Sequence, residues 1–341
     1  MTKSRIASDR MRRVTLRDVA QLSGVSEISV SRVMRNAPSV SQRLRARVLT
    51  AANELGYTPN RLAGALKTSS SNLVAVIVPS IGNGVFPEVL DGIEEVLADA
   101  GLQPVLGITQ YYRAREVQVL RDMLAWSPMG VIMAGSDHEP AVARMIERHA
   151  IPVVEFMDID RAPMQASVGI SNVEAAIAVA DLLAERGYKR PGYIGAWSER
   201  PDRSKARRLA FEARLQGLGI PLVDKEIAPM PASVEVGARS TEILLARSPE
   251  IDAIFFANDD QALGALFHCQ RSGRRVPKDI GLIGFNGIDI GRALPTTLAS
   301  VVTPRYQMGI ETARLLLAAA DDPTAEKVIN LGFEIRPGES I

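Results

Sequence analysis

From Leu73 onwards, short continuous apolar runs alternate with segments whose apolar residues recur at helical spacing. A continuous apolar run bounded by turn residues is typical of a strand covered on both faces, as in a parallel sheet flanked by helices. The expected strands are Val74–Pro79, Pro104–Ile108, Gly130–Ala134, Val153–Met157, Gly192–Ala196, Ala253–Ala257 and Gly281–Phe285, with helices between them such as Val89–Ala100, Val117–Trp126, Ala175–Arg186, Ala206–Leu218 and Gln261–Ser272. Because such units fall in both halves of the chain, the pattern predicts two α/β subdomains with a ligand cleft at the carboxyl ends of their strands.

The chain has 341 residues, more than one hydrophobic core usually organises, so at least two domains are expected. Its single cysteine excludes a disulfide framework, and its three scattered histidines form no metal-binding pattern. The first residues are polar and basic, and no apolar run approaches the length of a membrane span. These features predict a cytoplasmic protein with no secretory signal, no membrane contact, and no metal or other cofactor.

The charge of the chain is unevenly distributed. Residues 1–68 hold 13 of the 40 Lys and Arg residues but only four of the 39 Asp and Glu residues, so this segment carries a net charge of +9 and the remainder −8. A small basic segment on an acidic body favours contact between that segment alone and a polyanion such as nucleic acid. Charge by itself leaves a solvated basic face as an equal alternative.

The pattern of residues 14–57 predicts three short helices. A side chain that can cap the first turn precedes each of them: Thr15, Ser26 and Ser41. Asp18 follows Thr15 by three residues and can complete a capping box. Gly24 supplies the permissive backbone of a tight turn, which gives the first two helices the spacing of a helix-turn-helix. The second helix would then point four side chains outward, toward a major groove: Glu27, Ile28, Ser31 and Arg32.

A series of motifs runs in order through the chain: VTLRDVA from Val14, GVS from Gly24, VSRV from Val30, LGYTPNR from Leu55, ANDDQALG from Ala257, VPKDI from Val276 and GF at Gly284. This series resembles the LacI/GalR family of transcriptional repressors. The resemblance implies an all-α helix-turn-helix head plus an α/β core of two periplasmic-binding-protein-like parallel-sheet subdomains. It also implies a homodimer that binds operator double-stranded DNA and a small-molecule effector.

The expected domain boundaries follow from the sequence pattern and this resemblance together. A mobile basic arm is expected over residues 1–13, the helix-turn-helix domain over 14–58, and a hinge helix with a linker over 59–72. The effector-binding core would cover residues 73–341. Its N-subdomain is expected at about 73–170 plus 304–326, and its C-subdomain at about 171–303 plus 327–341.

Residues of the head that contact DNA are implied by the resemblance. In the family, the start of the second helix and its arginine touch bases, which implies base contacts by Glu27, Ile28 and Arg32. Arg32 would donate two hydrogen bonds to a guanine, Ile28 would touch a thymine methyl group, and Glu27 would accept from a cytosine. Four further side chains suit phosphate contacts, with helix capping as an equal alternative for the hydroxyls: Thr15, Ser31, Asn36 and Ser41.

Residues 59–66 resemble the family's hinge helix, which pairs with its copy across the operator. In this resemblance Leu66, with Ala63 beside it, wedges into the central minor-groove step. The alternative is that Leu66 packs on the core. Gly64 stands where the family usually has a better helix former, which would make the hinge depend more on DNA for its order.

An effector cleft is implied as well. Asp259 matches the family carboxylate that accepts paired sugar hydroxyls, and Arg207 matches the family's effector arginine, with Arg203 close to it in sequence. Arginines at the start of a helix suit a carboxylate or a phosphate, and a solvated helix face is the alternative. Three further candidates follow the first and last of the expected strands: Ser80, Phe86 and Asn286.

Other motifs narrow the ligand: IPVVEFMD from Ile151, HCQR from His268, DIG from Asp289, LASV from Leu298 and LGF from Leu331. They resemble the gluconate-operon repressor branch of the family. The resemblance implies repression of sugar-acid catabolic genes and release from DNA when gluconate binds, with its carboxylate on Arg207 and its hydroxyls on Asp259. A phosphorylated or keto relative of gluconate, and corepression in place of induction, stay open.

Two other classes of function fit an α/β core. A dinucleotide-binding enzyme needs G-x-G-x-x-G after its first strand, which Pro79–Gly84 does not match, and neither a P-loop nor a G-x-S-x-G motif occurs. A free sugar-binding receptor would share the core, but the basic head and the expected lack of a signal peptide argue against it. The sequence therefore favours a DNA-binding repressor over an enzyme or a receptor.

Overall fold

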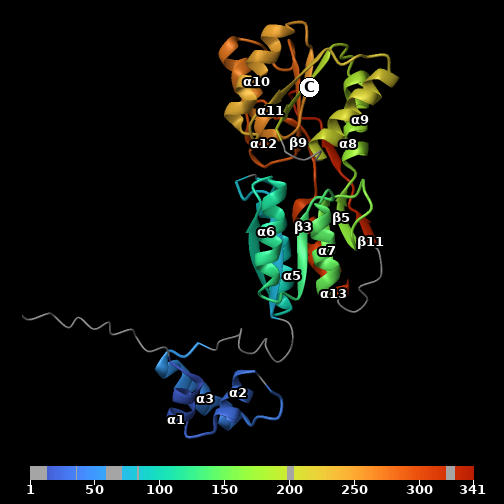
Figure 1. Ribbon diagram of the computed structural model, residues 1–341. Helices are drawn as coiled ribbons and strands as arrows, with labels where there is room; N and C mark the ends of the chain where they lie inside the picture. Colours follow the sequence, from blue (N-terminus) through green and yellow to red (C-terminus); the bar gives the residue numbers. More distant parts are fainter. Residues whose placement is uncertain (1–13, 36, 59–70, 83, 198–202, 320–326) are drawn as a thin grey trace, which may run out of the picture. The chain divides into compact units, whose positions relative to one another are not determined.

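The computed structural model describes residues 14–35, 37–58, 71–82, 84–197, 203–319 and 327–341. The chain forms two compact units, residues 1–69 and 70–341, which Figure 1 shows. The expected arm over residues 1–13 lies outside the described residues. So do Asn36 and nearly all of the expected hinge, including Ala63 and Leu66.

The smaller unit is a three-helix head made of α1 (Leu16–Ser23), α2 (Glu27–Met34) and α3 (Gln42–Leu55). Each helix contributes one completely buried valine to a common core: Val19, Val30 and Val48. Small side chains, Ala20 among them, fill the space between the helices. The apolar faces that the sequence assigns to these helices therefore do meet.

All three helices of the head begin at the expected caps. The hydroxyl of Thr15 accepts from the backbone N–H of Asp18, and the Asp18 carboxylate accepts from the N–H of Thr15 at 2.8 Å, which closes the capping box. Ser26 and Ser41 each accept from the N–H three residues on. Gly24 has φ 64°, a left-handed conformation that ends α1 and turns the chain toward α2. The predicted helix-turn-helix is confirmed.

The larger unit has two lobes, each built on a six-stranded sheet. The N-lobe sheet has the order β11-β5-β4-β3-β1-β2, with all neighbours parallel. Its strands are β1 (Leu73–Val78), β2 (Gln103–Ile108), β3 (Gly130–Ala134), β4 (Val153–Asp158), β5 (Ala166–Ile170) and β11 (Lys327–Asn330). Its helices are α5 (Val85–Asp99), α6 (Arg113–Leu124), α7 (Pro140–His149) and α13 (Arg305–Ala319).

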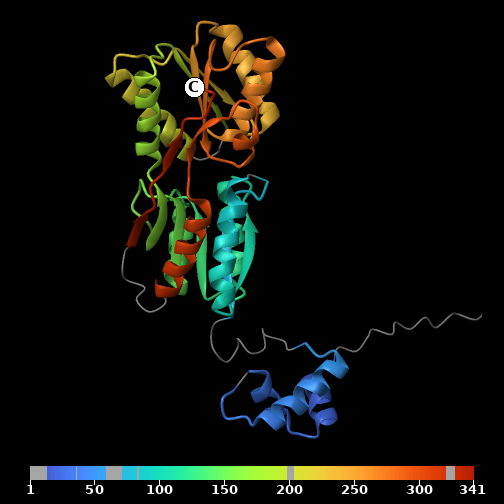
Figure 2. The same cartoon turned by 180° about the vertical axis from the view of Figure 1, so that it is seen from behind.

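Strand β1 shows why its apolar run is continuous. Val74, Val76 and Val78 pack in the cluster that contains α5 and α13, whereas Ala75 and Ile77 pack in the cluster that contains α6 and α7. Both faces of the strand are therefore covered, as Figures 1 and 2 show. The α5–α13 contact is close, because a Cβ atom on Gly92 would lie 2.3 Å from the carbonyl oxygen of Tyr306.

The C-lobe sheet has the order β12-β10-β9-β8-β6-β7, and only the β12–β10 pair is antiparallel among its described neighbours. Its strands are β6 (Pro191–Ala196), β7 (Asp224–Ala228), β8 (Ala253–Phe256), β9 (Gly281–Asn286), β10 (Ala299–Val302) and β12 (Glu334–Arg336). Its helices are α8 (Asn172–Glu185), α9 (Arg203–Gly217), α10 (Val234–Arg247), α11 (Asp259–Ser272) and α12 (Ile290–Ala293). The predicted fold class, with two predominantly parallel sheets, is confirmed.

The expected division of the core is wrong at one point. Residues 327–341 were expected in the C-subdomain, but residues 327–330 form β11 in the N-lobe sheet, where Val328 is the register partner of Ser167. The described strands thus change sheet three times, after β5, after β10 and after β11. An edge strand as short as β11 carries no pattern of its own that indicates which of two similar sheets it joins.

Two absences apply to the residues that the structure describes. No helix among them has both the length and the apolar character needed to cross a membrane. No group of three or more His, Cys, Asp or Glu side chains among them is arranged to hold a metal ion.

Candidate functional site

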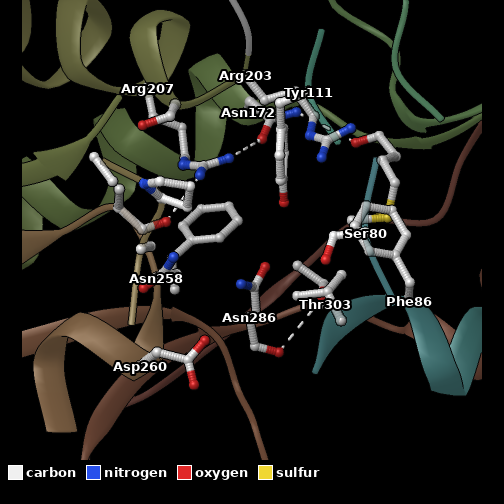
Figure 3. Close-up of a pocket in the computed structure, with 18 of the residues that line it drawn as sticks. Ser80, Phe86, Tyr111, Asn172, Arg203, Arg207, Asn258, Asp260, Asn286 and Thr303 are labelled. Carbon is white, nitrogen blue, oxygen red and sulfur yellow. Dashed lines mark hydrogen bonds between the residues drawn. The ribbon is translucent and has the colours of Figure 1, made fainter. Parts of the chain in front are cut away.

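A cavity of about 270 Å³ lies between the two lobes, where strands of both sheets end. Its polar lining combines side chains from both lobes, several of which are labelled in Figure 3: Ser80, Tyr111, Asn172, Arg203, Ser204, Arg207, Asn258, Asp260, Asn286 and Thr303. Apolar walls come from Phe86, Met157, Trp197, Phe285 and Met308, among others. The cavity occupies the position that the strand pattern predicts for a ligand cleft.

Arg207 extends from α9 to this cavity and is only 7% exposed. Its Nη1 donates to Oδ1 of Asn172 at 2.6 Å and its Nη2 donates to the carbonyl oxygen of Ala257 at 2.9 Å. The guanidinium carbon lies 3.9 Å from the centroid of the Phe285 ring. These contacts fix the plane of the guanidinium group, so it is already oriented when a ligand arrives.

Four other residues that the sequence singles out also line the cavity: Arg203, Ser80, Phe86 and Asn286. Asn286 ends β9 with φ 110°, an unusual conformation for a residue other than glycine. Its carbonyl oxygen accepts from the Arg305 guanidinium, which also donates to Glu88 of α5 at 2.7 Å. A lining residue of the C-lobe is therefore tied to an N-lobe helix.

Asp259 does not line the cavity, although its resemblance to the family carboxylate implied that it would. It is completely buried, and its carboxylate accepts from the Ser300 hydroxyl at 2.6 Å and from the Ile288 N–H at 2.7 Å. Burial raises the pKa of Asp259 to about 6, although these two hydrogen bonds oppose that rise. Asp259 begins α11 and its side chain is directed into the C-lobe, so the carboxylate that lines the cavity is that of the next residue, Asp260.

Several lining residues were not predicted from the sequence, and Asn172 is one of them. Asn172 is 1% exposed and begins α8, directly after the chain crosses from the N-lobe strand β5 to the C-lobe. Tyr111, Trp197, Asn258 and Thr303 also line the cavity. The sequence could have indicated Trp197 and Asn258, because both directly follow strands that it does predict.

A second cavity, of about 220 Å³, adjoins the first and shares Tyr111 and Arg203 with it. Its lining includes four carboxylates: Glu116, Asp137, Asp158 and Asp160. Several of them have cationic or hydrogen-bonding partners, for example Asp137 with Arg161 at 2.8 Å. Each cavity is lined by two arginines, but the second has four carboxylates and the first has one, so the second disfavours an anionic ligand.

Glu116 also belongs to a buried charged cluster in the N-lobe. His138 contacts Glu116 through Nδ1 at 2.9 Å and Glu155 through Nε2 at 3.1 Å, and all three side chains are less than 5% exposed. Burial by itself lowers the pKa of His138, but hydrogen bonds to the two carboxylates outweigh burial and raise the pKa to about 9. The imidazole is therefore protonated at neutral pH and joins α6 to β4.

The head presents the side chains that were expected to contact bases. Glu27, Ile28 and Arg32 are all exposed on α2, and Ile28 is 67% exposed although it is apolar. Ser31 is half-buried, whereas Thr15 and Ser41 are exposed and cap their helices. An exposed apolar side chain can contact a thymine methyl group.

Each of the two units matches the model of a known protein family. Residues 15–60 match the model of bacterial regulatory proteins of the lacI family, and residues 180–341 match that of the periplasmic binding protein-like domain. The HTH-type transcriptional regulator GntR of Escherichia coli is 38% identical over 97% of this chain and 99% of its own length.

Solved structures give the same result. A transcriptional regulator of the LacI family from Silicibacter pomeroyi is 42% identical, covers 96% of this chain and 99% of its own, and superposes with a TM-score of 0.90. The lac repressor dimer bound to operator has a TM-score of 0.82 over 96% of this chain, at 22% identity, which shows a common fold.

Proposed function

This chain belongs to the LacI family of bacterial regulatory proteins and is a DNA-binding transcriptional regulator, and from that premise we propose that it represses sugar-acid catabolic genes and leaves its operator when a gluconate-type polyhydroxy acid binds in the cleft. The family consists of transcription regulators and not of enzymes. The observation that carries the proposal is Arg207, a nearly buried guanidinium held ready at a cavity of suitable size.

The chemistry of the cleft supports an anionic polyol. A carboxylate can accept two parallel hydrogen bonds from a guanidinium group, and such charge-assisted pairs are strong where water is excluded. Arg203 adds a second cation to the same lining, and the amides of Asn258 and Asn286 offer donors and acceptors for hydroxyl groups. Phe86 and Trp197 provide apolar surface against which the C–H groups of an extended sugar acid can lie.

The DNA-binding part of the proposal rests on the head. We propose that Glu27, Ile28 and Arg32 contact bases, while Thr15, Ser31, Asn36 and Ser41 contact phosphates. A homodimer would present two recognition helices to half-sites about one helical turn apart. Ala63 and Leu66 would insert at the centre of the operator, in the minor groove. The effector would act through its different affinities for the DNA-bound and the released states.

Calorimetry on the intact protein tests the ligand. Gluconate, 6-phosphogluconate and 2-ketogluconate are titrated beside neutral sugars such as glucose, and the proposal expects a sugar acid to bind most tightly. Duplexes selected by the protein from a random pool then supply an operator, and the ligand that binds is added to the complex. Tight binding of a neutral sugar alone contradicts the proposed ligand class, and tightening of the DNA complex by the ligand contradicts induction.

A further inference from the structure

Asn172 stands at the junction of the two lobes and touches both. We propose that Asn172 is the positioning residue through which a ligand on Arg207 of the C-lobe is sensed by the N-lobe. The inference rests on the proposed function, since it assumes that the ligand's anionic group meets Arg207. It adds the residue that converts occupancy of the cleft into a change of the N-lobe.

The side chain of Asn172 bridges opposite charges. Its Oδ1 accepts from Nη1 of Arg207 at 2.6 Å, while its Nδ2 donates to Oδ1 of Asp158 at 3.2 Å and to the carbonyl oxygen of Met157 at 3.3 Å. The amide therefore lies between a cation of the C-lobe and a carboxylate at the end of N-lobe strand β4. Its orientation is determined, because only the oxygen can accept from Arg207 and only the nitrogen can donate to Asp158.

The backbone of Asn172 is also hydrogen-bonded to the N-lobe. Its N–H donates to Oδ2 of Asp160 at 2.7 Å, and Asp160 also accepts from the Ser171 hydroxyl and the Val173 N–H. The first turn of α8 is thus fastened to the loop that follows β4. Because these hydrogen bonds tie the loop to α8, a displacement of the Asn172 side chain acts on an anchored helix end.

Asp158 continues the connection into the N-lobe. Its Oδ2 accepts from the hydroxyl of Ser136, which lies between β3 and α7. The neighbouring residue Asp137 pairs with Arg161 and contacts Arg113 at the start of α6. Hydrogen bonds therefore join Arg207 through Asn172 and Asp158 to Ser136. The peptide link from Ser136 to Asp137 then leads to the ion pairs with Arg161 and Arg113.

A ligand carboxylate would disturb this series at its first member. The carboxylate competes with Oδ1 of Asn172 for the guanidinium N–H groups and draws the cation toward the cavity. Loss or lengthening of that hydrogen bond also weakens the one to Asp158, because hydrogen bonds in series polarise one another in a medium of low dielectric. Asn172 is 1% exposed, so water cannot replace the lost partner.

The experiment separates the two sides of the amide. Asn172→Asp keeps an acceptor for Arg207, now a charged one, but puts a carboxylate against Asp158, so the hydrogen bond on the N-lobe side is lost while the contact with Arg207 is kept. Asp158→Asn with Asn172→Asp restores one amide and one carboxylate in exchanged positions. Gln165→Ala is the matched control, because Gln165 is an amide that bridges Val153 and Ile151 within one lobe, away from the cleft.

The readout is the coupling factor, which is the ratio of gluconate dissociation constants measured with and without a saturating selected operator duplex. Wild-type protein and Gln165→Ala are expected to give a factor in the usual range of about 5- to 150-fold. Asn172→Asp is expected to reduce it below about 3-fold, and the double exchange is expected to recover most of it. A merely structural role would lower the free energy of unfolding of Asn172→Asp and leave its coupling factor at the wild-type value.

Each outcome decides the matter. A wild-type coupling factor in Asn172→Asp overturns the inference, as does a double exchange that stays uncoupled. If Asn172→Asp fails to fold, Asn172→Ser takes its place, since serine is too short to reach both partners. If neither gluconate nor another acid of the panel binds the wild-type protein, the proposed function fails and this inference fails with it. The inference fails alone when the wild-type protein shows coupling but the variants do not give the expected factors.

Discussion

The guanidinium group of Arg207 lies over the ring of Phe285, with its central carbon 3.9 Å from the ring centroid. Stacking and two hydrogen bonds from its two Nη atoms define the plane of the group. A lysine has one compact ammonium group and cannot stack or donate in this fork. These contacts therefore require an arginine, and a positive charge alone would not make them.

Arg207→Lys should weaken gluconate binding by about 10- to 100-fold, since roughly 1.4–2.8 kcal/mol is lost with the planar fork. Calorimetry measures the change. Arg214→Lys serves as the control, because Arg214 lies on the same helix and pairs with Asp181 at the surface. Equal losses in the two variants would mean that the orientation of Arg207 does not matter.

Asp259→Ala should lower the free energy of unfolding by about 3 kcal/mol, because the Ser300 hydroxyl and the Ile288 N–H lose a buried acceptor. Urea denaturation measures it. Asp260→Ala, one residue on, should change the free energy of unfolding by less than about 1 kcal/mol. A fully stable Asp259→Ala variant that has lost only its response to the effector would restore the role that the sequence suggested.

His138 should make the stability of the core depend on pH. Its pKa is raised to about 9 in the folded protein from 6.5 in the unfolded chain, so the stabilisation is complete below pH 6.5 and is lost as the pH rises toward 9. The loss is on the order of 3 kcal/mol at 1.36 kcal/mol per pKa unit. Urea midpoints at half-unit steps of pH measure it.

The control for this prediction is His138→Gln. It should be less stable than the wild type at pH 6.5, because two buried carboxylates lose their cation, and it should lack the decline between pH 6.5 and 9. The same slope in both proteins would assign the pH dependence to other groups.

Arg32→Ala should weaken binding to a selected operator by about 1–3 kcal/mol and relax the preference at one base position. Arg43→Ala removes the same charge from α3 and should weaken binding evenly across sequences. Selection from a random pool followed by titration of single-base variants distinguishes the two. Unchanged base preference in Arg32→Ala would remove Arg32 from the reading surface.

Local chemistry explains which features the sequence predicts. The caps at Thr15, Ser26 and Ser41 each depend on a hydroxyl and an N–H three residues away, so they can be predicted without knowledge of the tertiary structure. The same holds for continuous apolar strands such as β3, whose predicted bounds, Gly130 to Ala134, are those observed. Arg207 was predicted because it lies on an expected helix and matches the family's effector arginine.

The rest depends on tertiary structure. Asp259 and Asp260 are adjacent carboxylates at the start of one helix, and only the packing of α11 against β9 decides which one reaches the cavity. Asn172 is surrounded by residues that are distant in sequence, Asp158 and Arg207 among them. Strand β7 has alternating exposed and half-buried residues at a sheet edge, and its charged sequence does not resemble the buried strands.

The path of the chain through the two lobes has a consequence for synthesis on the ribosome. The N-lobe sheet needs β11, which ends at Asn330, and its face needs α13, which begins at Arg305. The head is complete by residue 58. At translation rates of about 5–20 residues per second, the head can fold roughly 10–50 s before the N-lobe receives its last strand. During that interval the nascent chain would carry a complete helix-turn-helix head beside an incomplete core.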